Sequence, residues 1–96
     1  MLAQKEAVKL DWTVVGSSNV KAVAYHEGSK TLAVQFNNGG QYSYESVDMD
    51  VYVDLVHAES VGRYLNNHVK GGYTYLKWFN EQELLTYITE RAPRKA

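Results

Sequence analysis

The sequence contains no cysteine and a single proline, Pro93, among its 96 residues. Without cysteine the chain cannot form disulfide bonds, zinc sites built on thiolates or a cysteine nucleophile. No apolar run approaches the roughly 20 residues that a membrane helix needs, and residues 1–12 lack the apolar segment of a signal peptide. We therefore expect one cytoplasmic domain, spanning residues 1–96, that makes no contact with membranes.

Charge of neither sign predominates, because 10 Lys and Arg face 11 Asp and Glu. A net charge of −1 argues against a general positive field for nucleic acid, since nonspecific affinity depends on several phosphate contacts. The charges are nevertheless segregated: residues 45–59 hold acidic but no basic side chains, and residues 63–77 hold basic but no acidic ones. This segregation reflects either differently solvated surfaces or a local basic face for a polyanion, and the sequence leaves both open.

Three stretches have the composition and alternation of β-strands. Residues 19–26 and 31–36 flank the polar turn 27–30, and residues 41–47 follow the turn 37–40. We predict an α+β fold in which a three-stranded antiparallel β-meander packs against short α-helices, with a further helix at the C-terminus. Residues 12–15 and 73–78 are candidates to extend this sheet.

Tyr42 and Tyr44 lie two residues apart, so they share one face of a strand and are either core or a stacking platform for an RNA base. A two-residue loop would place them on the face of the sheet that does not carry the apolar side chains of the preceding strand. A three-residue loop ending in a left-handed Gly39 would place them on the same face as that set. Hydrophobic patterning favours the second register, so we predict that both tyrosines are structural. The apolar set consists of Leu32, Val34 and Phe36.

After residue 47 the apolar residues fall four apart, as they do on a helix. We predict a helix in residues 48–58 with Asp48 as its N-cap. A second helical pattern follows in residues 60–70, and Gly71 and Gly72 are expected to end it. The predicted apolar face of this second helix consists of Val61, Tyr64, Leu65 and His68.

Residues 80–92 are predicted to form the C-terminal helix, and residues 93–96 a polar tail. Asn80 is the expected N-cap and Glu83 the third helical residue, while Phe79 and Leu84 occupy the positions of a hydrophobic staple. The expected buried stripe consists of Leu84, Leu85 and Ile88. Residues 1–11 lack a strong cap and receive no assignment.

A series of short motifs follows in order along the chain: Ser17-Ser18-Asn19, Tyr25, Tyr42 with Tyr44, Val51-Tyr52, Ser60 with Gly62, Tyr64 with Asn66, Lys70-Gly71, and Tyr73 with Tyr75. In this order and spacing, residues 14–77 resemble the KTSC domain. This family is named for its occurrence at the C-terminus of some lysyl-tRNA synthetases, and it also occurs as small stand-alone proteins in bacteria and phages. The resemblance implies an α+β domain, with RNA binding suggested by the synthetase context.

The sequence departs from the family pattern in three places. The family usually has proline at Asp48 or Met49 and phenylalanine at Leu65, and these changes suit helix initiation and core filling. The helix that begins at Asn80 lies outside the domain. That added helix could cover a surface that is open in other members.

Signatures of an enzyme are weak. His26, His57 and His68 have neither metalloprotease spacing nor cysteine partners. We predict no catalytic residues, no metal and no small-molecule cofactor.

The most suggestive group of residues lies between 63 and 77. Basic side chains beside aromatic rings and a glycine loop could hold a phosphate while a base stacks. Alternatively, Tyr73 and Tyr75 close the sheet or cap the helices, and the lysines lie in solvent. The predicted nucleic-acid-binding residues are Arg63, Lys70, Gly71, Tyr73 and Lys77.

We therefore predict a small non-enzymatic binding module with RNA as its ligand. The alternative is a protein–protein interaction or regulatory module, including a phage-encoded one that acts on a host protein. The acidic residues 45–59 suit that alternative.

Overall fold

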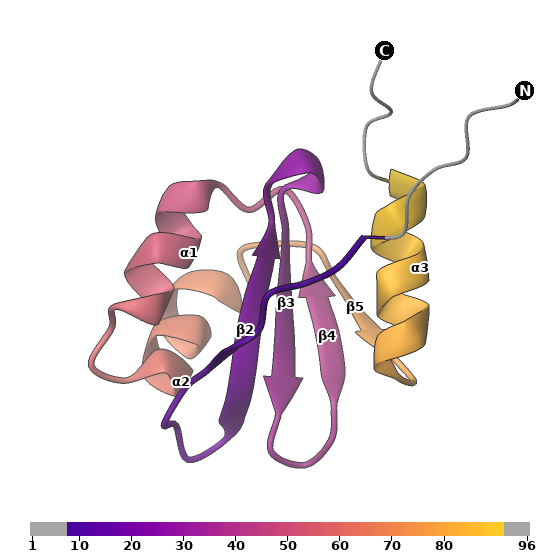
Figure 1. The fold of residues 1–96 in the computed structure, drawn as a ribbon. Helices are drawn as coiled ribbons and strands as arrows, with labels where there is room; N and C mark the ends of the chain where they lie inside the picture. The colour runs from indigo at the N-terminus through magenta and orange to yellow at the C-terminus, as the bar shows by residue number, and fades with distance from the viewer. Residues whose placement is uncertain (1–7, 92–96) are drawn as a thin grey trace, which may run out of the picture.

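A computed structural model describes residues 8–91, which form an antiparallel sheet with helices on both faces (Figure 1). The five strands lie in the order β1-β2-β3-β4-β5. Helices α1 and α2 cover one face, and α3 covers the other. In chain order the elements are β1 (Thr13–Val14), β2 (Val20–His26), the 3-10 helix η1 (Glu27–Ser29), β3 (Thr31–Phe36), β4 (Gln41–Tyr44), α1 (Met49–Val56), α2 (Val61–Tyr64), the π-helix η2 (Leu65–Val69), β5 (Tyr75–Trp78) and α3 (Glu81–Arg91).

The predicted α+β class and the C-terminal helix are confirmed, but three strands are too few. Both candidate extensions pair with the meander: β1 with β2 through Thr13 and Val23, and β5 with β4 through Tyr75 and Tyr44. Strand β1 has only two residues, and its Val14 is 79% exposed. So short a strand shows no alternation in the sequence, which is why the strand number could not be fixed from the pattern.

The turn between β3 and β4 has the predicted three-residue form. Val34 pairs with Tyr42, and Leu32 pairs with Tyr44. The Phe36 N–H donates to the carbonyl oxygen of Gly40 at 2.9 Å, and Gly39 has a φ of +93°. Glycine adopts this left-handed conformation without the steric cost that a Cβ brings. The predicted register is confirmed, and both tyrosines lie on the face that meets α1 and α2.

The first core lies between this face and the helices α1, α2 and η2. Tyr25 stacks on Tyr52 with ring centroids 5.3 Å apart and donates its hydroxyl hydrogen to the carbonyl oxygen of Val47, which joins β2 to the start of α1. Asp48 is the N-cap residue, as predicted, but its side chain makes no capping bond. Its carboxylate instead pairs with Lys30 at 3.2 Å. The fully buried members of this core include Val20, Val23, Leu32, Val34, Val47, Leu55 and Val69.

The apolar face predicted for the second helix needs one correction. His68 is exposed, and Val69 is the buried residue in its place. After Tyr64 the helix widens into η2, in which the Lys70 N–H donates to the carbonyl oxygen of Leu65 at 2.8 Å. This five-residue step adds one residue to the turn, so the core position moves from residue 68 to residue 69.

The second core joins α3 to the opposite face of the sheet. Leu84 and Ile88 pack on Ala24 and Ala33, and all four are fully buried. The small alanines let the helix axis come close to the sheet. Each buried aliphatic side chain contributes about 1.5–3 kcal/mol by leaving water.

Polar contacts also fix α3. The Tyr87 hydroxyl donates to Glu45, and Arg91 pairs with Glu45 at 3.5 Å. The Tyr87 ring also packs on Trp78 of β5, whose indole N–H donates to Ser43 at 2.9 Å. The added helix therefore covers the face opposite to the one on which Tyr42 and Tyr44 lie.

The start of α3 follows the predicted cap but not the predicted staple. The Glu83 N–H donates to Asn80 Oδ1 at 2.9 Å, and Glu83 Oε1 accepts from the Phe79 N–H at 2.9 Å. Phe79 is 88% exposed, whereas Leu84 is buried against the alanines, so the expected staple is wrong. The polar tail predicted for 93–96 and the unassigned residues 1–7 lie outside the described residues.

Ile88→Ala should lower the free energy of unfolding by about 2–5 kcal/mol, because it leaves a cavity between α3 and the sheet. Gln82→Ala is the control, since Gln82 is exposed on the same helix and should change stability by less than about 0.5 kcal/mol. Urea unfolding followed by circular dichroism measures both. An Ile88→Ala variant as stable as the parent would contradict the packing of α3 on this face.

Candidate functional site

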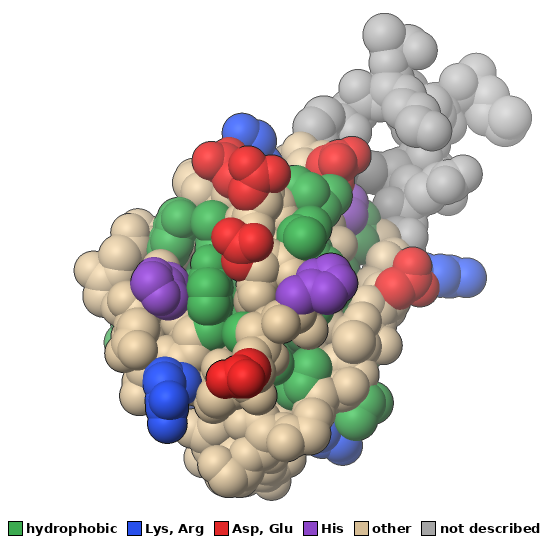
Figure 2. Space-filling view, turned by 90° about the vertical axis from the view of Figure 1, so that its left-hand side faces the viewer, with side chains coloured by type: hydrophobic (Ala, Val, Ile, Leu, Met, Phe, Trp, Pro, Cys, Tyr) green, Lys and Arg blue, Asp and Glu red, His purple; other side chains and the backbone are tan. Residues whose placement is uncertain are grey.

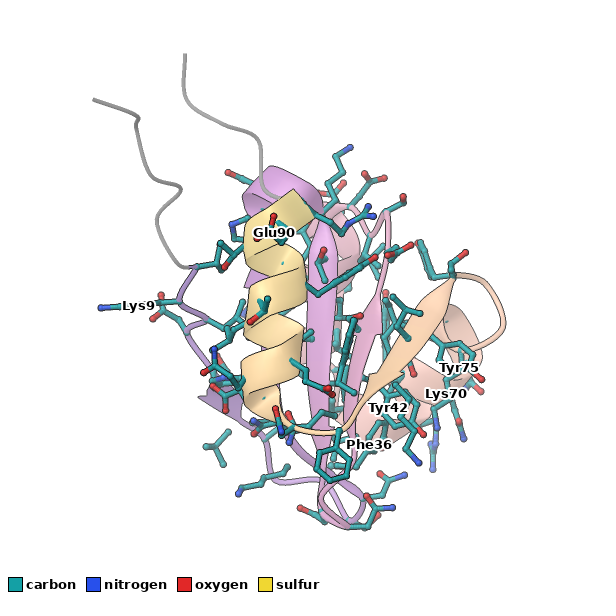
Figure 3. The ribbon with its side chains drawn as sticks, turned by 90° about the vertical axis from the view of Figure 1, so that its right-hand side faces the viewer. Lys9, Phe36, Tyr42, Lys70, Tyr75 and Glu90 are labelled. Atoms are coloured by element: carbon teal, nitrogen blue, oxygen red, sulfur yellow. The ribbon has the colours of Figure 1, made fainter. Side chains whose placement is uncertain are left out.

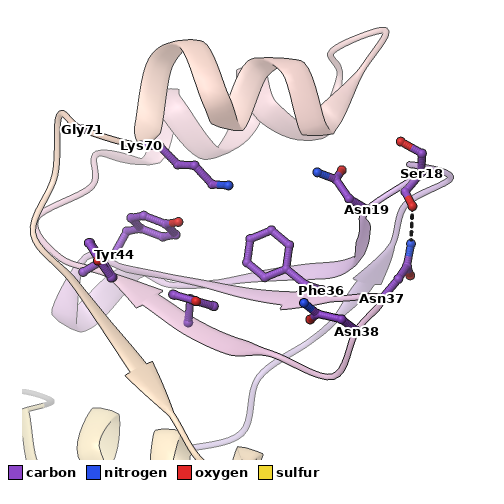
Figure 4. A pocket seen from close by; sticks show the side chains of 10 residues that line it. Ser18, Asn19, Phe36, Asn37, Asn38, Tyr44, Lys70 and Gly71 are labelled. Atoms are coloured by element: carbon purple, nitrogen blue, oxygen red, sulfur yellow. Dashed lines mark hydrogen bonds between the residues drawn. The ribbon is translucent and has the colours of Figure 1, made fainter.

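A pocket of about 610 Å³ lies on the tyrosine-bearing face of the sheet (Figure 4). We call it the aromatic pocket. Its size falls in the range of small-molecule sites, about 300–1,000 Å³. The pocket is lined by Ser18, Asn19, Phe36, Asn37, Asn38, Tyr42, Tyr44, Lys70, Gly71 and Tyr75.

The pocket exists because the helices do not cover the whole face. Helix α1 packs against β2, so the part of the face over β4 and β5 stays uncovered by it. The chain leaves η2 at Lys70, and Gly71, with a φ of +85°, turns it toward β5. Lys70 therefore extends over the open part of the sheet (Figure 4).

Aromatic rings form a continuous row across the pocket. Phe36 meets Tyr42 edge to face at 5.2 Å between centroids. Tyr75 lies 5.9 Å from Tyr42 and 6.1 Å from Tyr44. Tyr44 is 2% exposed and Tyr75 is 57% exposed, so the row runs from the core to the surface. The register explains the row, because Tyr44 pairs with Tyr75 across β4 and β5.

Two ammonium groups lie over these rings. Lys70 Nζ is 5.2 Å from the centroid of Phe36, and Lys77 Nζ is 5.9 Å from the centroid of Tyr42. Both distances fall within the range of cation–π attraction. Figure 3 shows Phe36, Tyr42, Lys70 and Tyr75 gathered on one side of the molecule, apart from α3.

The phenol of Tyr44 stays neutral beneath these charges. Burial raises the pKa of Tyr44 to about 12, and electrostatic repulsion from Tyr42 and Tyr75 adds to the rise. The pocket floor therefore carries no phenolate from Tyr44 at neutral pH.

The wall of the pocket is made by two loops held together through Asn37. Its amide nitrogen donates to the carbonyl oxygens of Ser17 at 3.3 Å and Ser18 at 3.0 Å. Its backbone N–H donates to the carbonyl oxygen of Asn19 at 2.9 Å. The β3–β4 turn and the segment before β2 thus form one rigid rim.

Gly62 supports this rim from below. A Cβ at Gly62 would lie 2.6 Å from Asn19 Oδ1 and 3.0 Å from Ser17 Oγ, so only glycine fits without a shift of its neighbours. Ser60 starts the helix beside it by accepting the Arg63 N–H at 3.2 Å. Gly62 therefore lets α2 lie against the loop that precedes β2, and Ser60 caps the same helix.

The five predicted site residues do not all meet. Lys70 and Gly71 line the aromatic pocket, and Lys77 reaches over Tyr42 from β5. Tyr73 packs against the first core and is not among the lining residues. Arg63 lines a second, more polar pocket of about 600 Å³, which shares Ser18 and Asn19 with the first.

Sequence reasoning missed several residues of the pocket. The sequence pattern predicts Phe36 only as a core residue, and it assigns no site role to the loop residues Asn19 and Asn38. The signal that could have found them is the shared face of Phe36 and Tyr42, together with the turns at the same end of the sheet.

Each of the three histidines contacts a residue three or four positions away in the sequence. His26 Nδ1 lies 2.7 Å from Ser29 Oγ, and burial lowers the pKa of His26. His57 Nδ1 lies 2.8 Å from the carbonyl oxygen of Val53, and His68 packs on Tyr64 with centroids 4.5 Å apart. Within residues 8–91, no three His, Cys, Asp or Glu side chains form a group that could hold a metal ion. No helix in the same range is long and apolar enough to span a bilayer.

Fold and pocket together define a small α+β domain that carries an aromatic site on an open part of its sheet. The sequence model of the KTSC domain matches residues 16–73, and the chain belongs to the KTSC family. The resemblance seen in the sequence is thereby confirmed. The match ends at residue 73, before β5 and α3.

Individual relatives agree with this assignment. The structure of a KTSC domain protein from Yersinia pestis superposes with a TM-score of 0.70 at 26% identity, covering 73% of this chain and 99% of that one. A protein of Tsukamurella paurometabola is 41% identical over 56 residues, which are 58% of this chain and 84% of the relative. A lysine–tRNA ligase of Nostoc punctiforme is 33% identical over 58 residues, which are 60% of this chain but only 10% of the ligase.

Gly62→Ala should lower the free energy of unfolding by about 1–3 kcal/mol, because the added methyl group overpacks the site against Asn19 and Ser17. Gly16→Ala is the matched control, since a Cβ there meets nothing within 4 Å. Thermal unfolding of the two variants makes the comparison. Alanine is normally favoured over glycine in a helix, so a Gly62→Ala variant more stable than the parent would contradict the tight contact.

Proposed function

We propose that this KTSC protein is a non-enzymatic module that binds single-stranded RNA in the aromatic pocket. The observation that carries the proposal is the pairing of accessible rings with ammonium groups: Tyr75 and Tyr42 beside Lys70 and Lys77. Rings of this kind stack on any base, and each stacked base contributes about 1–3 kcal/mol. The lysines supply charge for the phosphate that joins a stacked base to the next one.

The relatives support RNA as the nucleic acid. A domain similar to this chain occurs in a lysine–tRNA ligase, a protein whose name gives tRNA as its substrate. With two lysines at the pocket and a net charge of −1, the expected affinity is modest. Two phosphate contacts on a single strand give a slope of about −1.4 in a plot of log affinity against log salt.

The test is a titration of the protein with a fluorescently labelled pool of short single-stranded RNA at low and moderate salt. Tyr75→Ala should weaken binding about 5-fold to 150-fold, because it removes one stacking surface. Lys70→Ala should weaken it and reduce the salt slope by about 0.7. Arg63→Ala is the control, since it removes the same charge from the other pocket. Absence of binding at low salt would refute the proposal, and equal losses for Arg63→Ala and Lys70→Ala would refute the location.

A second candidate function is the recognition of a protein partner by α1. Met49 and Val53 are 39% and 43% exposed and lie four residues apart, beside Asp50 and Asp54. Figure 2 shows acidic and apolar side chains side by side on this face of the molecule. An apolar stripe with an acidic border suits a helix that carries apolar and basic side chains.

Affinity capture tests this second candidate. A partner bound through α1 should be recovered by the parent protein and by Lys70→Ala, but lost with Val53→Asp, which places a charge in the apolar stripe. Circular dichroism checks that the Val53→Asp variant is folded. A partner recovered equally by all three proteins would exclude α1 as the contact surface.

A further inference from the structure

Several polar groups of the aromatic pocket are fixed so that they present hydrogen-bond donors. Asn38 Oδ1 is occupied, because it accepts the Gly40 N–H at 2.9 Å. A backbone N–H can only be met by the amide oxygen, so this bond fixes the orientation of the Asn38 side chain. Its NH2 group has no hydrogen-bond partner within the described residues and is available to a ligand.

Asn19 is oriented in the same way through Ser17. The Ser17 hydroxyl oxygen accepts the backbone N–H of Val20 at 3.4 Å and that of Asn19 at 3.5 Å. Its own hydrogen is therefore directed to Asn19 Oδ1, 3.1 Å away. The oxygen of Asn19 is thus occupied too, and its NH2 group points toward the ammonium group of Lys70 (Figure 4).

The remaining residues do not reverse this bias. Lysine has three donors and no acceptor, and none of the ten described residues that line the pocket carries a carboxylate. Asn37 donates its NH2 group to the carbonyl oxygens of Ser17 and Ser18, so only the oxygen of its amide is left as an acceptor at this rim. The hydroxyls of Tyr42, Tyr44 and Tyr75 can both donate and accept, so they adapt to whatever binds.

The donor groups of Lys70, Asn19 and Asn38 lie around the ring of Phe36. In Figure 4 the Lys70 ammonium group and the Asn19 amide approach from opposite sides above Phe36, and Asn38 lies at the edge of the same ring. A flat ligand stacked at this place meets donors along more than one edge. It must therefore present acceptors along more than one edge.

From this donor set we infer that the aromatic pocket binds a uracil base. The inference rests on the proposed RNA-binding function and names the base that the same site selects. Uracil carries carbonyl oxygens on both sides of its single ring N–H. Cytosine has an amino group in place of one of these carbonyls, adenine has an amino group and no carbonyl, and guanine carries an amino group as well. An amino group opposite Asn19, Asn38 or Lys70 would place donor against donor and leave both unpaired.

Titrations with labelled oligouridylate, oligocytidylate and oligoadenylate of equal length test the inference. The parent protein should bind oligouridylate about 10-fold more tightly than the other two, since a site with unpaired donors rejects the mismatched ligand. Asn19→Asp keeps the shape and the bond from Ser17 but replaces the donor by an acceptor. This variant should lose the preference for uridine over cytidine, because the cytosine amino group then finds a partner.

Asn67→Asp is the control for charge. It adds the same negative charge in the neighbouring polar pocket, so it should weaken the binding of all oligonucleotides alike and keep the uridine preference. Equal binding of the three oligonucleotides by the parent protein would overturn the inference and leave RNA binding in place. Binding of none of them at low salt would overturn the proposed function, and the inference with it. A ratio unchanged by Asn19→Asp would also overturn the inference.

Discussion

The register of the β3–β4 hairpin is the constraint on which the rest of the molecule depends. The side-chain period of a strand is two, so a slip by one residue would send Tyr42 and Tyr44 to the opposite face. That face is already filled by Leu84 and Ile88 against small side chains, and it has no room for two phenols. The three-residue turn with its left-handed Gly39 therefore determines both cores, as well as the position of every ring in the pocket.

One face of the sheet is closed by packing against α3, and the other face stays partly open as a pocket. Alanines and Ser43 on one face allow α3 to lie close, so this face is closed by aliphatic packing and by the contacts of Trp78 and Tyr87. The other face carries large aromatic side chains that pack on one another. Helices α1, α2 and η2 therefore cover only part of it. The helix that lies beyond the KTSC match is thus added to the face that does not carry the pocket.

Local patterns in the sequence predicted more of the fold than of the site. Alternation located β3 and the turn after it, and capping signals located the start of α3 at Asn80, because these features depend on neighbouring residues. The π-helix η2 was not predicted, because His68 and Val69 are adjacent in the sequence and only tertiary packing decides which of them is buried. The predicted staple at Phe79 failed for a similar reason, because the alanine face of the sheet holds Leu84. Asn19 reaches the pocket through contacts across the chain with Asn37 and Gly62, which no local spacing reveals.

Core and binding surface are not alternatives for the central tyrosines. Tyr44 is almost fully buried and belongs to the first core, and the same ring lines the pocket beside the exposed Tyr75. Because Tyr44 is held in the core, the row of aromatic rings that it begins cannot rearrange freely at its exposed end, Tyr75. A ligand that stacks on it therefore loses less free energy to the ordering of side chains than it would on isolated surface rings. The packing that specifies this fold also prepares the surface on which a flat ligand can lie.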